Sequence, residues 1–505
     1  MGLTRPLKCE LVMSSENRGD KEDEGSSGSL KESSSSESSP RGSIYTESRQ
    51  YAPGSHAAVG HTIENSIPLS IFPIQLDKFC ICVCGLPGVG KTHIARRLAR
   101  YLEFFHAVPV SMFNGSEVRR KKFGLWDNAT YFDSSSDESR GMLNIVNTEI
   151  LESISTFFAE HDNGVAILDS SSLLGDHEKR LNMVRHINAQ GVKCIFIEVS
   201  QKDRTELLVP YDSPDYEGFS RTDAQTDYQK RCDMYQATYV ELDADETNGV
   251  ESRFSYVKCD PNRQHFVIHN VSGYLQLKIV HFIINLRTQP HDFYLTRHGQ
   301  SEYNALGRIG GDSGLSEHGL NYARKLAEFV EDTMLIDNFG SDTPGRLWTS
   351  TMRRTRETAQ FIKQPTIKIQ DNDDPSLVHE WVQMRARAWH HLDELFAGTC
   401  DGMTYEEIEE QFPEEFLRRK TDKLAYRYPR GESYLDVIAR LEPMIIEMER
   451  HREPLLIVGH QGILRIVYAF YMVSILWLSI PHYTATTALT NTSSYSRSIY
   501  SYFLY

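Results

Sequence analysis

Short apolar runs alternate with helical patterns through most of this chain of 505 residues. In its first half the runs are FCICVCG, GVAILDSSS and VKCIFIEVS, at residues 79–85, 164–172 and 192–200. THIARRLARYLEFF, which starts at Thr92, has apolar residues at helical spacing, and a second helical stretch covers residues 180–189. Continuous apolar runs are typical of strands covered on both faces. We therefore predict a parallel sheet with helices on both sides.

The second half repeats this alternation with different sequences. DFYLTRHG, RLWTS and PLLIVGH are predicted strands, and LNYARKLAEFVED and YLDVIARLEPMIIEMERHR are predicted helices between them. No internal repeat is visible, and the motifs change near Pro290, where we place a boundary. The fold class is therefore α/β with two domains, at residues 71–290 and 291–505, a number that the chain length allows.

The N-terminal 70 residues have a different composition. Twelve of the thirty residues from Ser14 to Ser43 are serine, and most of the others are charged, Gly or Pro. Such a segment buries too little apolar surface to offset its chain entropy, so we predict that residues 1–70 form a disordered tail.

Charge and cysteine usage narrow the function classes. A net charge of -15 argues against nucleic acid or an anionic membrane as the main partner. Cys80, Cys82 and Cys84 alternate along one predicted strand, which favours buried thiols over a metal site. Reduced thiols, and an N-terminus without the apolar core of a secretory signal, favour a cytoplasmic protein.

The apolar run IVYAFYMVSILWLSIP, which starts at Ile466, is shorter than the ~20 residues of a membrane span. We predict a buried helix behind His460 instead.

A glycine loop follows the first predicted strand. The sequence from Gly85 to Thr92, GLPGVGKT, has the P-loop spacing and lies between a strand and a helix. Backbone N–H groups there hold phosphates, so the predicted nucleotide site is Gly85, Gly88, Gly90, Lys91 and Thr92. The alternative is a glycine turn that merely closes the strand. Asp169, at a later strand end, could hold Mg²⁺ with Thr92 or orient an acceptor hydroxyl, or instead cap the next helix.

A different constellation occupies the second half. His298, Arg354 and His460 each follow a predicted strand, and parallel strands bring such positions to one sheet edge. A neutral imidazole can attack phosphorus, arginines stabilise the transition-state charge, and Glu394 is the best candidate for the acid that protonates the leaving oxygen. We predict phosphate-ester hydrolysis through a phosphohistidine.

This set resembles the histidine phosphatase superfamily. GRIGGDSGLSEHG, TYEEIEEQFPEEF and YRYPRGESYLDVIARLEP, together with the preceding P-loop, are similar to the family of bifunctional 6-phosphofructo-2-kinase/fructose-2,6-bisphosphatases over roughly residues 72–470. The resemblance implies a P-loop NTPase-like kinase domain and a histidine-phosphatase domain. One would make fructose 2,6-bisphosphate from fructose 6-phosphate with ATP and Mg²⁺, and the other would hydrolyse it without a cofactor. The family also implies a homodimer.

The resemblance assigns roles by position. His298 is the nucleophile and Glu394 the acid, while the reacting phosphate is bound by Arg297, Asn304, Gly310, Arg354 and His460. The resemblance implies that the rest of the sugar bisphosphate is bound by Arg427, Arg430, Gln461 and Arg465. In the kinase half the matching positions are Arg119 or Arg120, Lys230, Arg231 and Tyr235.

The chain departs from the family mainly in the kinase half. Gly88 and Val89 stand where the family usually has Ala-Arg, and Asp133 and Gly175 replace two further arginines. Ser171, Ser172 and Pro210 also replace family residues, the last a catalytic lysine. Each lost phosphate contact costs roughly 1.5–3 kcal/mol, so losing two or three weakens sugar binding by ~10³-fold. We predict a kinase impaired with fructose 6-phosphate that still binds nucleotide.

The phosphatase half departs less. Phe416 replaces a tyrosine, and the C-terminus does not resemble the family's closing strand, which predicts an incompletely covered sheet. Two alternatives stay open, a noncatalytic nucleotide-binding regulator or scaffold and a phosphatase for another sugar phosphate.

Overall fold

A computed structural model describes residues 78–125, 129–133, 136–200, 209–211, 213–243, 254–260, 265–287, 292–335, 343–370, 378–472 and 499–501. The predicted disordered tail and the boundary at Pro290 lie outside these ranges. Within them, no helix is both long enough and apolar enough to cross a membrane.

A six-stranded sheet forms the first half, in the order β2-β3-β1-β4-β5-β6. Its strands are β1 Phe79–Cys84, β2 Val110–Asn114, β3 Val165–Asp169, β4 Lys193–Val199, β5 Ser255–Asp260 and β6 His265–His269. All pairs are parallel except β5 with β6. The predicted strands in this half are confirmed.

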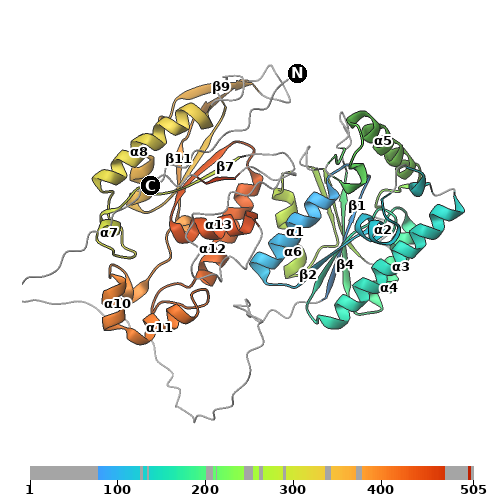
Figure 1. Ribbon diagram of the computed structural model, residues 1–505, viewed down its shortest axis with the longest axis horizontal. Helices are drawn as coiled ribbons and strands as arrows, with labels where there is room; N and C mark the ends of the chain where they lie inside the picture. The colour runs from blue at the N-terminus through green and yellow to red at the C-terminus, as the bar shows by residue number, and fades with distance from the viewer. Residues whose placement is uncertain are drawn as a thin grey trace, which may run out of the picture. The chain divides into compact units, whose positions relative to one another are not determined.

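Helices cover both faces of this sheet. They are α1 Lys91–His106, α2 Gly115–Phe123, α3 Asp137–Glu160, α4 His177–Asn188, α5 Arg221–Thr238 and α6 Tyr274–Asn285. Figure 1 shows α1 and α6 on one side of this sheet and α3 and α4 on the other. Ile81 and Val83 of β1 pack with α1 and α6, whereas Cys80, Cys82 and Cys84 pack with α3 and α4. The predicted burial of these three cysteines is confirmed, since none is more than 1% exposed.

A second, parallel sheet forms the other half, in the order β11-β8-β12-β7-β13. Its strands are β7 Phe293–Arg297, β8 Arg346–Ser350, β11 Ala386–Trp389, β12 Leu455–Gly459 and β13 Ile499–Ser501, and β9 Thr366–Gln370 pairs separately with β10 Val378–Val382. The helices are α7 Glu302–Ala305, α8 Glu317–Phe329, α9 Arg353–Ala359, α10 Tyr405–Gln411, α11 Pro413–Thr421, α12 Tyr434–Arg450 and α13 Gln461–Met472.

Apolar side chains of this sheet also point to both sides. Phe293 and Ile457 pack with α12 and α13, while Tyr294 and Leu456 pack with α8 and α9. The α/β class with helices on both faces is therefore confirmed for both halves. The predicted helix LNYARKLAEFVED differs at its C-terminal end. Its α-helical part, α8, ends at Phe329, and a π-helical turn follows at Val330–Met334.

The chain end differs from the prediction. The buried helix predicted after His460 is confirmed as far as Met472, with Ile463 and Val467 fully buried, and the rest of that run lies outside the described residues. However, Ile499–Ser501 pairs with β7, so the sheet edge that we predicted to be incompletely covered carries a short strand at these positions. Strand pairing uses backbone groups, which any non-proline sequence supplies to an open sheet edge.

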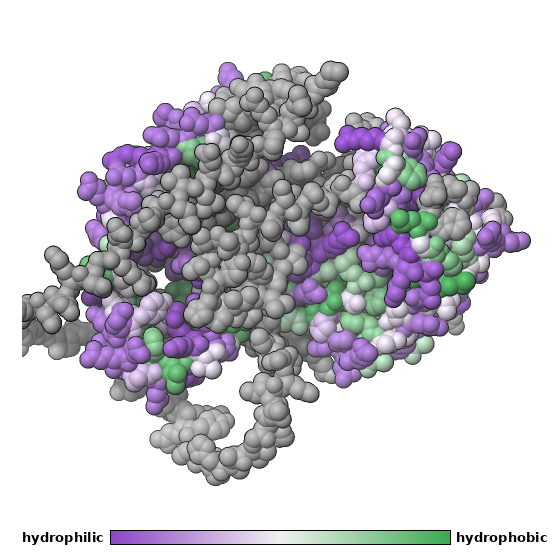
Figure 2. Space-filling model, viewed as in Figure 1, coloured by the Kyte–Doolittle hydropathy of each residue, from purple (hydrophilic) through white to green (hydrophobic). Residues whose placement is uncertain are grey.

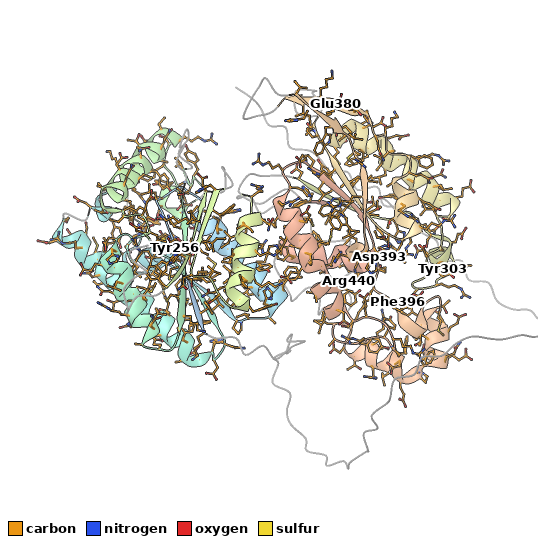
Figure 3. All side chains as sticks on the ribbon, turned by 180° about the vertical axis from the view of Figure 1, so that it is seen from behind. Tyr256, Tyr303, Glu380, Asp393, Phe396 and Arg440 are labelled. Atoms are coloured by element: carbon orange, nitrogen blue, oxygen red, sulfur yellow. The ribbon has the colours of Figure 1, made fainter. Side chains whose placement is uncertain are left out.

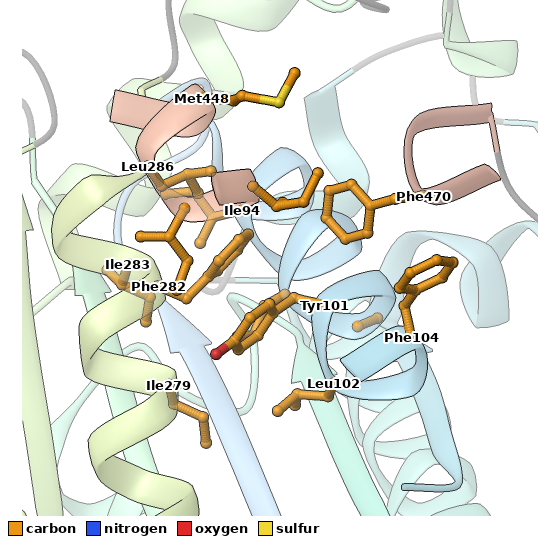
Figure 4. Packing of buried hydrophobic residues seen from close by; sticks show 14 of the residues in the cluster. Ile94, Tyr101, Leu102, Phe104, Ile279, Phe282, Ile283, Leu286, Met448 and Phe470 are labelled. Carbon is orange, nitrogen blue, oxygen red and sulfur yellow. The ribbon is translucent and has the colours of Figure 1, made fainter. Parts of the chain in front are cut away.

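One apolar cluster runs through both halves. α1 and α6 pack against α12 and α13, with Phe104 and Phe470 in edge contact at 5.4 Å between ring centroids (Figure 4). Arg97 of α1 forms an ion pair with the buried Glu449 of α12. On the outer face drawn in Figure 2, coloured residues are mostly hydrophilic, and apolar ones gather in small groups. Burial thus concentrates the large apolar side chains between these helices.

Candidate active sites

The predicted nucleotide loop joins β1 to α1. Gly85, Gly88 and Gly90 have φ angles of 128°, 75° and 89°, which glycine adopts without the strain of a side chain. A Cβ on Gly85 would lie 2.3 Å from the carbonyl oxygen of Val199, so the loop needs glycine there for space as well. Lys91 Nζ folds back and donates to the carbonyl oxygen of Leu86 at 2.8 Å. Loop, lysine and helix start thus form a ready anion site.

Asp169 lies beside this loop. Thr92 Oγ1 donates to Asp169 Oδ2 at 2.5 Å, and Asn114 Nδ2 donates to the same oxygen at 2.9 Å. The alternative that Asp169 caps the next helix is wrong, because Asp176 caps α4. A carboxylate and a hydroxyl are the hard oxygen donors that Mg²⁺ takes alongside nucleotide phosphates, so Thr92 and Asp169 fit that ion.

The structure brings the predicted kinase arginines together around one carboxylate. Arg119 donates to Asp215 Oδ2, and Arg120 Nη1 and Arg231 Nη1 each lie 3.5 Å from that oxygen. Arg119 and Arg231 are 1% and 5% exposed, so they form a buried cationic cluster. Tyr235 belongs to it through Phe132, whose ring lies under the guanidinium of Arg231 and 5.7 Å from the Tyr235 ring. Lys230, in contrast, is exposed.

The substituted kinase residues have internal roles or add negative charge. Asp133 directly follows Phe132, whose ring contacts the guanidinium groups of Arg119 and Arg231, and it adds a negative charge to this segment. Ser172 Oγ donates to Asn147 at 2.7 Å. The carbonyl oxygen of Pro210 accepts from Ser213 N–H at 2.9 Å, and the proline side chain supplies no charge.

His298 and His460 meet at the carboxyl ends of adjacent strands. Gly459 pairs with Arg297, His298 N–H donates to the carbonyl oxygen of Gly459 at 3.0 Å, and the two imidazole centroids lie 5.1 Å apart. Arg354 Nε lies 3.2 Å from His298 Nε2 and 3.3 Å from His460 Nδ1. The predicted convergence of these three residues is what the strand register produces.

The hydrogen bonds define which nitrogens carry protons. Because Arg354 Nε is a donor, His298 Nε2 and His460 Nδ1 are acceptors. The other nitrogens are then protonated. His298 Nδ1 donates to the carbonyl oxygen of Gly299 at 2.7 Å, and His460 Nε2 donates to Ser350 Oγ at 2.7 Å. His298 therefore presents an unprotonated Nε2 to the site.

Burial keeps both rings neutral. His298 is 6% exposed and His460 is fully buried. Desolvation, reinforced by the charges of Arg354 and Arg297, lowers the pKa of His298 to about 3. Desolvation and Arg354 likewise hold the pKa of His460 well below its usual value. Neutral imidazole is the nucleophilic form, so His298 stays reactive at neutral and mildly acidic pH.

Glu394 reaches this site from the loop after β11. Its Oε2 accepts from Gly462 N–H at 3.5 Å and its Oε1 accepts from Leu395 N–H at 3.1 Å. A Cβ at position 462 would lie 2.6 Å from Glu394 Oε1, so Gly462 makes room for the carboxyl group. Burial raises the pKa of Glu394, although both N–H groups and Arg354 oppose the rise. A raised pKa keeps a fraction of this group protonated at higher pH, as a general acid requires.

Three other predicted phosphate residues make different contacts. Arg297 ends β7, and its charge lowers the pKa values of both histidines. Ser301 caps α7, and Asn304 completes the capping box, in which its amide oxygen accepts from Ser301 N–H. Gly310, at φ 68°, packs against Asp401, which leaves no space for a Cβ. Asn304 and Gly310 thus shape the segment that leads to Gly311, whose carbonyl oxygen accepts from Arg354 Nη1.

The predicted sugar-binding residues lie on two segments beside the site. Gln461 and Arg465 are exposed on the first turns of α13, directly after His460. Arg427 and Arg430 are exposed on the segment before α12, where Arg427 Nε donates to Asp436 at 2.8 Å. Arg465 also adds to the local positive charge. Burial lowers the pKa of Lys423, and the charges of Arg419 and Arg465 lower it further. Phe416 packs with the apolar cluster of Tyr426 and Tyr428.

Sequence reasoning missed several residues that order this site. Ser350 was predicted only as the end of a strand, Gly462 had no visible signal, and Arg419 and Arg440 were hidden in helical patterns. Ser350 follows an apolar strand run as a buried polar residue, which is a signal that could have found it. The others act through contacts that depend on tertiary structure.

Comparison with known proteins places the two halves in known families. The family model for 6-phosphofructo-2-kinase matches residues 70–290, and that for the histidine phosphatase superfamily (branch 1) matches residues 293–496. Among solved structures, Bacillus stearothermophilus YhfR covers 38% of this chain and 85% of its own at 27% identity, with a TM-score of 0.29.

Curated relatives span both halves. A 6-phosphofructo-2-kinase/fructose-2,6-bisphosphatase of Caenorhabditis elegans is 36% identical, covering 77% of this chain and 81% of its own length. That of Aquarana catesbeiana is 34% identical over 78% of this chain and 77% of its own. A Saccharomyces cerevisiae relative, named fructose-2,6-bisphosphatase, is 34% identical over 81% of this chain and 85% of its own.

Proposed function

Since this chain belongs to the family of bifunctional 6-phosphofructo-2-kinase/fructose-2,6-bisphosphatases, we propose that it is an enzyme of fructose 2,6-bisphosphate metabolism in which hydrolysis is the better-preserved activity. The observation that carries the hydrolase is the single Arg354 nitrogen between the His298 and His460 imidazoles. A noncatalytic regulator would not need a desolvated nucleophile and a raised-pKa carboxyl group in one pocket.

Hydrolysis proceeds in two steps. His298 Nε2 attacks the phosphorus of the 2-phosphate, the bond from phosphorus to the sugar oxygen breaks, and Glu394 gives its proton to that oxygen. Water then attacks the phosphohistidine, its proton returns to Glu394, and the N–P bond breaks to release phosphate. Arg354 and Arg297 stabilise the negative charge of both transition states, and His460 holds Arg354 in place.

The remaining sugar bisphosphate is bound by arginines at the exposed side of the pocket. Arg427, Arg430 and Arg465, with Gln461, are the groups we assign to it, because they flank the acid and the start of α13. Phe416 provides apolar contact but no hydroxyl group. Fructose 6-phosphate is the product of this half.

In the other half, ATP binds at the loop of Gly85, Gly88 and Gly90 with Lys91, and Thr92 and Asp169 hold Mg²⁺. We propose that phosphoryl transfer to fructose 6-phosphate is weak there. Two observations support this. Arg119 and Arg231 already pair with Asp215, and Asp133 adds negative charge directly after Phe132, whose ring contacts both guanidinium groups. The Saccharomyces cerevisiae relative, which spans both halves, is named only for hydrolysis.

The domain assignment follows the same division, with kinase-like residues 71–290 and phosphatase residues 291–505. A homodimer is proposed from the family resemblance alone, and size-exclusion chromatography with light scattering tests it.

Trapping the phosphoenzyme tests the hydrolase. Fructose 2,6-bisphosphate labelled in the 2-phosphate is mixed with the full chain, quenched in base and mapped, with label expected on His298 in the wild type. H298A should abolish both label and phosphate release, whereas H318N, at an exposed histidine of α8, should keep both. Phosphate release from a different sugar phosphate, but not from this one, would favour the alternative substrate class. Release that survives in H298A would overturn the mechanism.

A coupled assay with ATP and fructose 6-phosphate tests the weakened kinase. We expect turnover to stay low at submillimolar fructose 6-phosphate, while calorimetry detects Mg–ATP binding that K91A abolishes. Robust turnover at submillimolar sugar phosphate would contradict the proposal.

A further inference from the structure

The loop that carries Glu394 is held in place by a helix on which sequence reasoning found no site residue. We call residues 390–397 the acid loop. It follows β11, and its Glu394 side chain contacts Gly462 of α13. A general acid must sit within hydrogen-bond reach of the leaving oxygen, so the position of this backbone matters to catalysis.

Arg440 of α12 binds three carbonyl groups of the acid loop. It donates to the carbonyl oxygen of His391 through Nη1, and to those of Asp393 at 2.6 Å and Glu394 at 3.4 Å through Nη2. Figure 3 shows Arg440 beside Asp393 and Phe396. A guanidinium has five donors in a rigid fork, and here that fork spans the backbone from His391 to the acid itself.

Glu432 binds both Arg440 and the acid loop. It accepts from Arg440 Nε at 2.9 Å and from Phe396 N–H at 3.0 Å, and its own backbone N–H donates to the carbonyl oxygen of Phe396 at 2.9 Å. Arg440 and Glu432 have side-chain exposures of only 17% and 26%, so solvent screens their pairing less than that of a surface pair.

The acid loop is also bound to the end of β8, the strand whose Ser350 forms a hydrogen bond with His460. Asp393 accepts from both the N–H and the hydroxyl group of Thr351, at 2.7 and 2.8 Å. Thr351 directly follows Ser350, the partner of His460. Glu394 therefore stands between two anchors, one at β8 and one at α12.

We propose that Arg440 is a positioning residue for the general acid, which it serves by fixing the acid-loop backbone around Glu394. This inference rests on the proposed phosphatase function. Arg440 reaches the loop through carbonyl groups and Glu432, and among the described residues it forms no hydrogen bond or ion pair with His298. Its loss should therefore impair proton delivery to the leaving group more than nucleophilic attack.

Substrates with different leaving groups separate these effects. A sugar alkoxide needs a proton to leave, whereas 4-nitrophenolate leaves without one. We expect R440M to lower kcat for fructose 2,6-bisphosphate by ~10²-fold or more, the range of general-acid catalysis, with less than about a fivefold loss for 4-nitrophenyl phosphate. E394Q should show the same pattern, and R440K should recover only part of the loss because an ammonium group cannot span three carbonyls.

The matched control is R346M, which removes a comparable ion pair, Arg346 with Glu453, away from the acid loop. It should change neither rate by more than about twofold. Should R440M fail to fold, judged by its thermal transition, R440K supplies the comparison. The alkaline limb of the kcat–pH profile is a second readout, which should flatten in R440M and R440K as in E394Q.

Equal losses on both substrates, or a change in KM alone, would overturn the inference and assign Arg440 to folding or binding. Unchanged rates would do the same. If the wild type hydrolyses neither ester, the proposed function itself fails. If it hydrolyses only the sugar bisphosphate, the pH profile decides the inference.

Discussion

His298 and His460 act as neutral imidazoles, and their surroundings explain why. Each lies at a buried strand end, beside a guanidinium that disfavours a second positive charge. The nearby Glu394 is affected in the opposite direction, since burial of a carboxyl group favours its uncharged, protonated form. Burial thus lowers the pKa of the nucleophile and raises that of the acid, and each shift favours the uncharged, reactive form.

These shifts predict the pH profile of hydrolysis. We expect kcat to show no loss from His298 between pH 6.5 and about 4, because its pKa is about 3. On the alkaline side kcat should fall as Glu394 ionises, at a pH above its usual range. Steady-state rates at saturating fructose 2,6-bisphosphate measure this, and E394Q should lose the alkaline limb. An acid limb centred near pH 6.5 that disappears in H460Q would contradict the assignment.

The same histidines affect stability with a definite sign. An unfolded histidine takes up a proton near pH 6.5, but His460 stays neutral in the fold. The unfolded state therefore binds more protons below pH 6.5, and stability falls there by ~1.4 kcal/mol per pH unit for each such group. Urea denaturation at pH 7, 6 and 5 should show a shallower decline for H460Q than for the wild type. H318N, at an exposed position, should match the wild type, and identical slopes for all three would count against neutral burial.

The chemistry-bearing residues could be predicted because each follows an apolar strand run. Strand ends of a parallel sheet meet at one edge, so His298, Arg354 and His460 converge without further information. Ser350, Gly462 and Arg440 could not be found this way. They act on the backbone or on the shape around another residue, and a contact between a guanidinium and a distant carbonyl leaves no pattern in the sequence.

Helices and loops explain the contrast between the two halves. In the kinase half, the segment between β2 and α3 supplies Arg119 and Phe132, and the middle of α5 supplies Arg231, to one buried cluster. The arginines are present, but Asp215 already neutralises part of their charge, and Asp133 follows Phe132 in that segment. A sugar phosphate would have to compete with carboxylates for these donors.

Removing the negative charge at the segment before α3 should improve sugar binding. We expect D133R to tighten fructose 6-phosphate binding by ~10-fold or more, as one restored charge-assisted contact is worth roughly 1.5–3 kcal/mol. Calorimetry in the presence of a nonhydrolysable ATP analogue measures the affinity. E138R makes the same charge change at an exposed position of α3 and should alter affinity by less than about twofold. Equal effects of both variants would show that net charge, not this position, limits binding.

Strands were predicted correctly where a continuous apolar run marks them, and they were missed at the edge of the second sheet. β1, β3, β4, β7, β8 and β12 lie where apolar runs predict them, since both faces of these strands are buried. β13 was not predicted, because its pairing with β7 draws on backbone groups and its sequence has no long apolar run. For the same reason β9 and β10, which form an exposed hairpin, gave no clear signal.

The two halves of the chain share one apolar core. The helix that begins at Lys91 of the nucleotide loop packs along its length against α12 and α13, and α13 begins directly after His460. Tyr101 of α1 stacks on Phe282 at 4.3 Å and donates to Glu442 of α12, which also pairs with Lys278 of α6. Amphipathic patterns predict that each helix buries a face. They cannot identify the partner, which is why the sequence suggested only a boundary near Pro290.

This shared core predicts that nucleotide binding protects the phosphatase. A ligand at 100 times its Kd stabilises the folded state by ~2.7 kcal/mol, and halves that unfold together receive this stabilisation jointly. We expect Mg–ATP analogue to lengthen the half-life of fructose-2,6-bisphosphatase activity at elevated temperature severalfold, with no protection in K91A. F470A removes the ring that packs on Phe104 and should shorten the half-life and reduce protection. If the analogue binds but phosphatase inactivation is unchanged, the halves unfold independently, and the packing of α1 on α12 and α13 does not couple their stabilities.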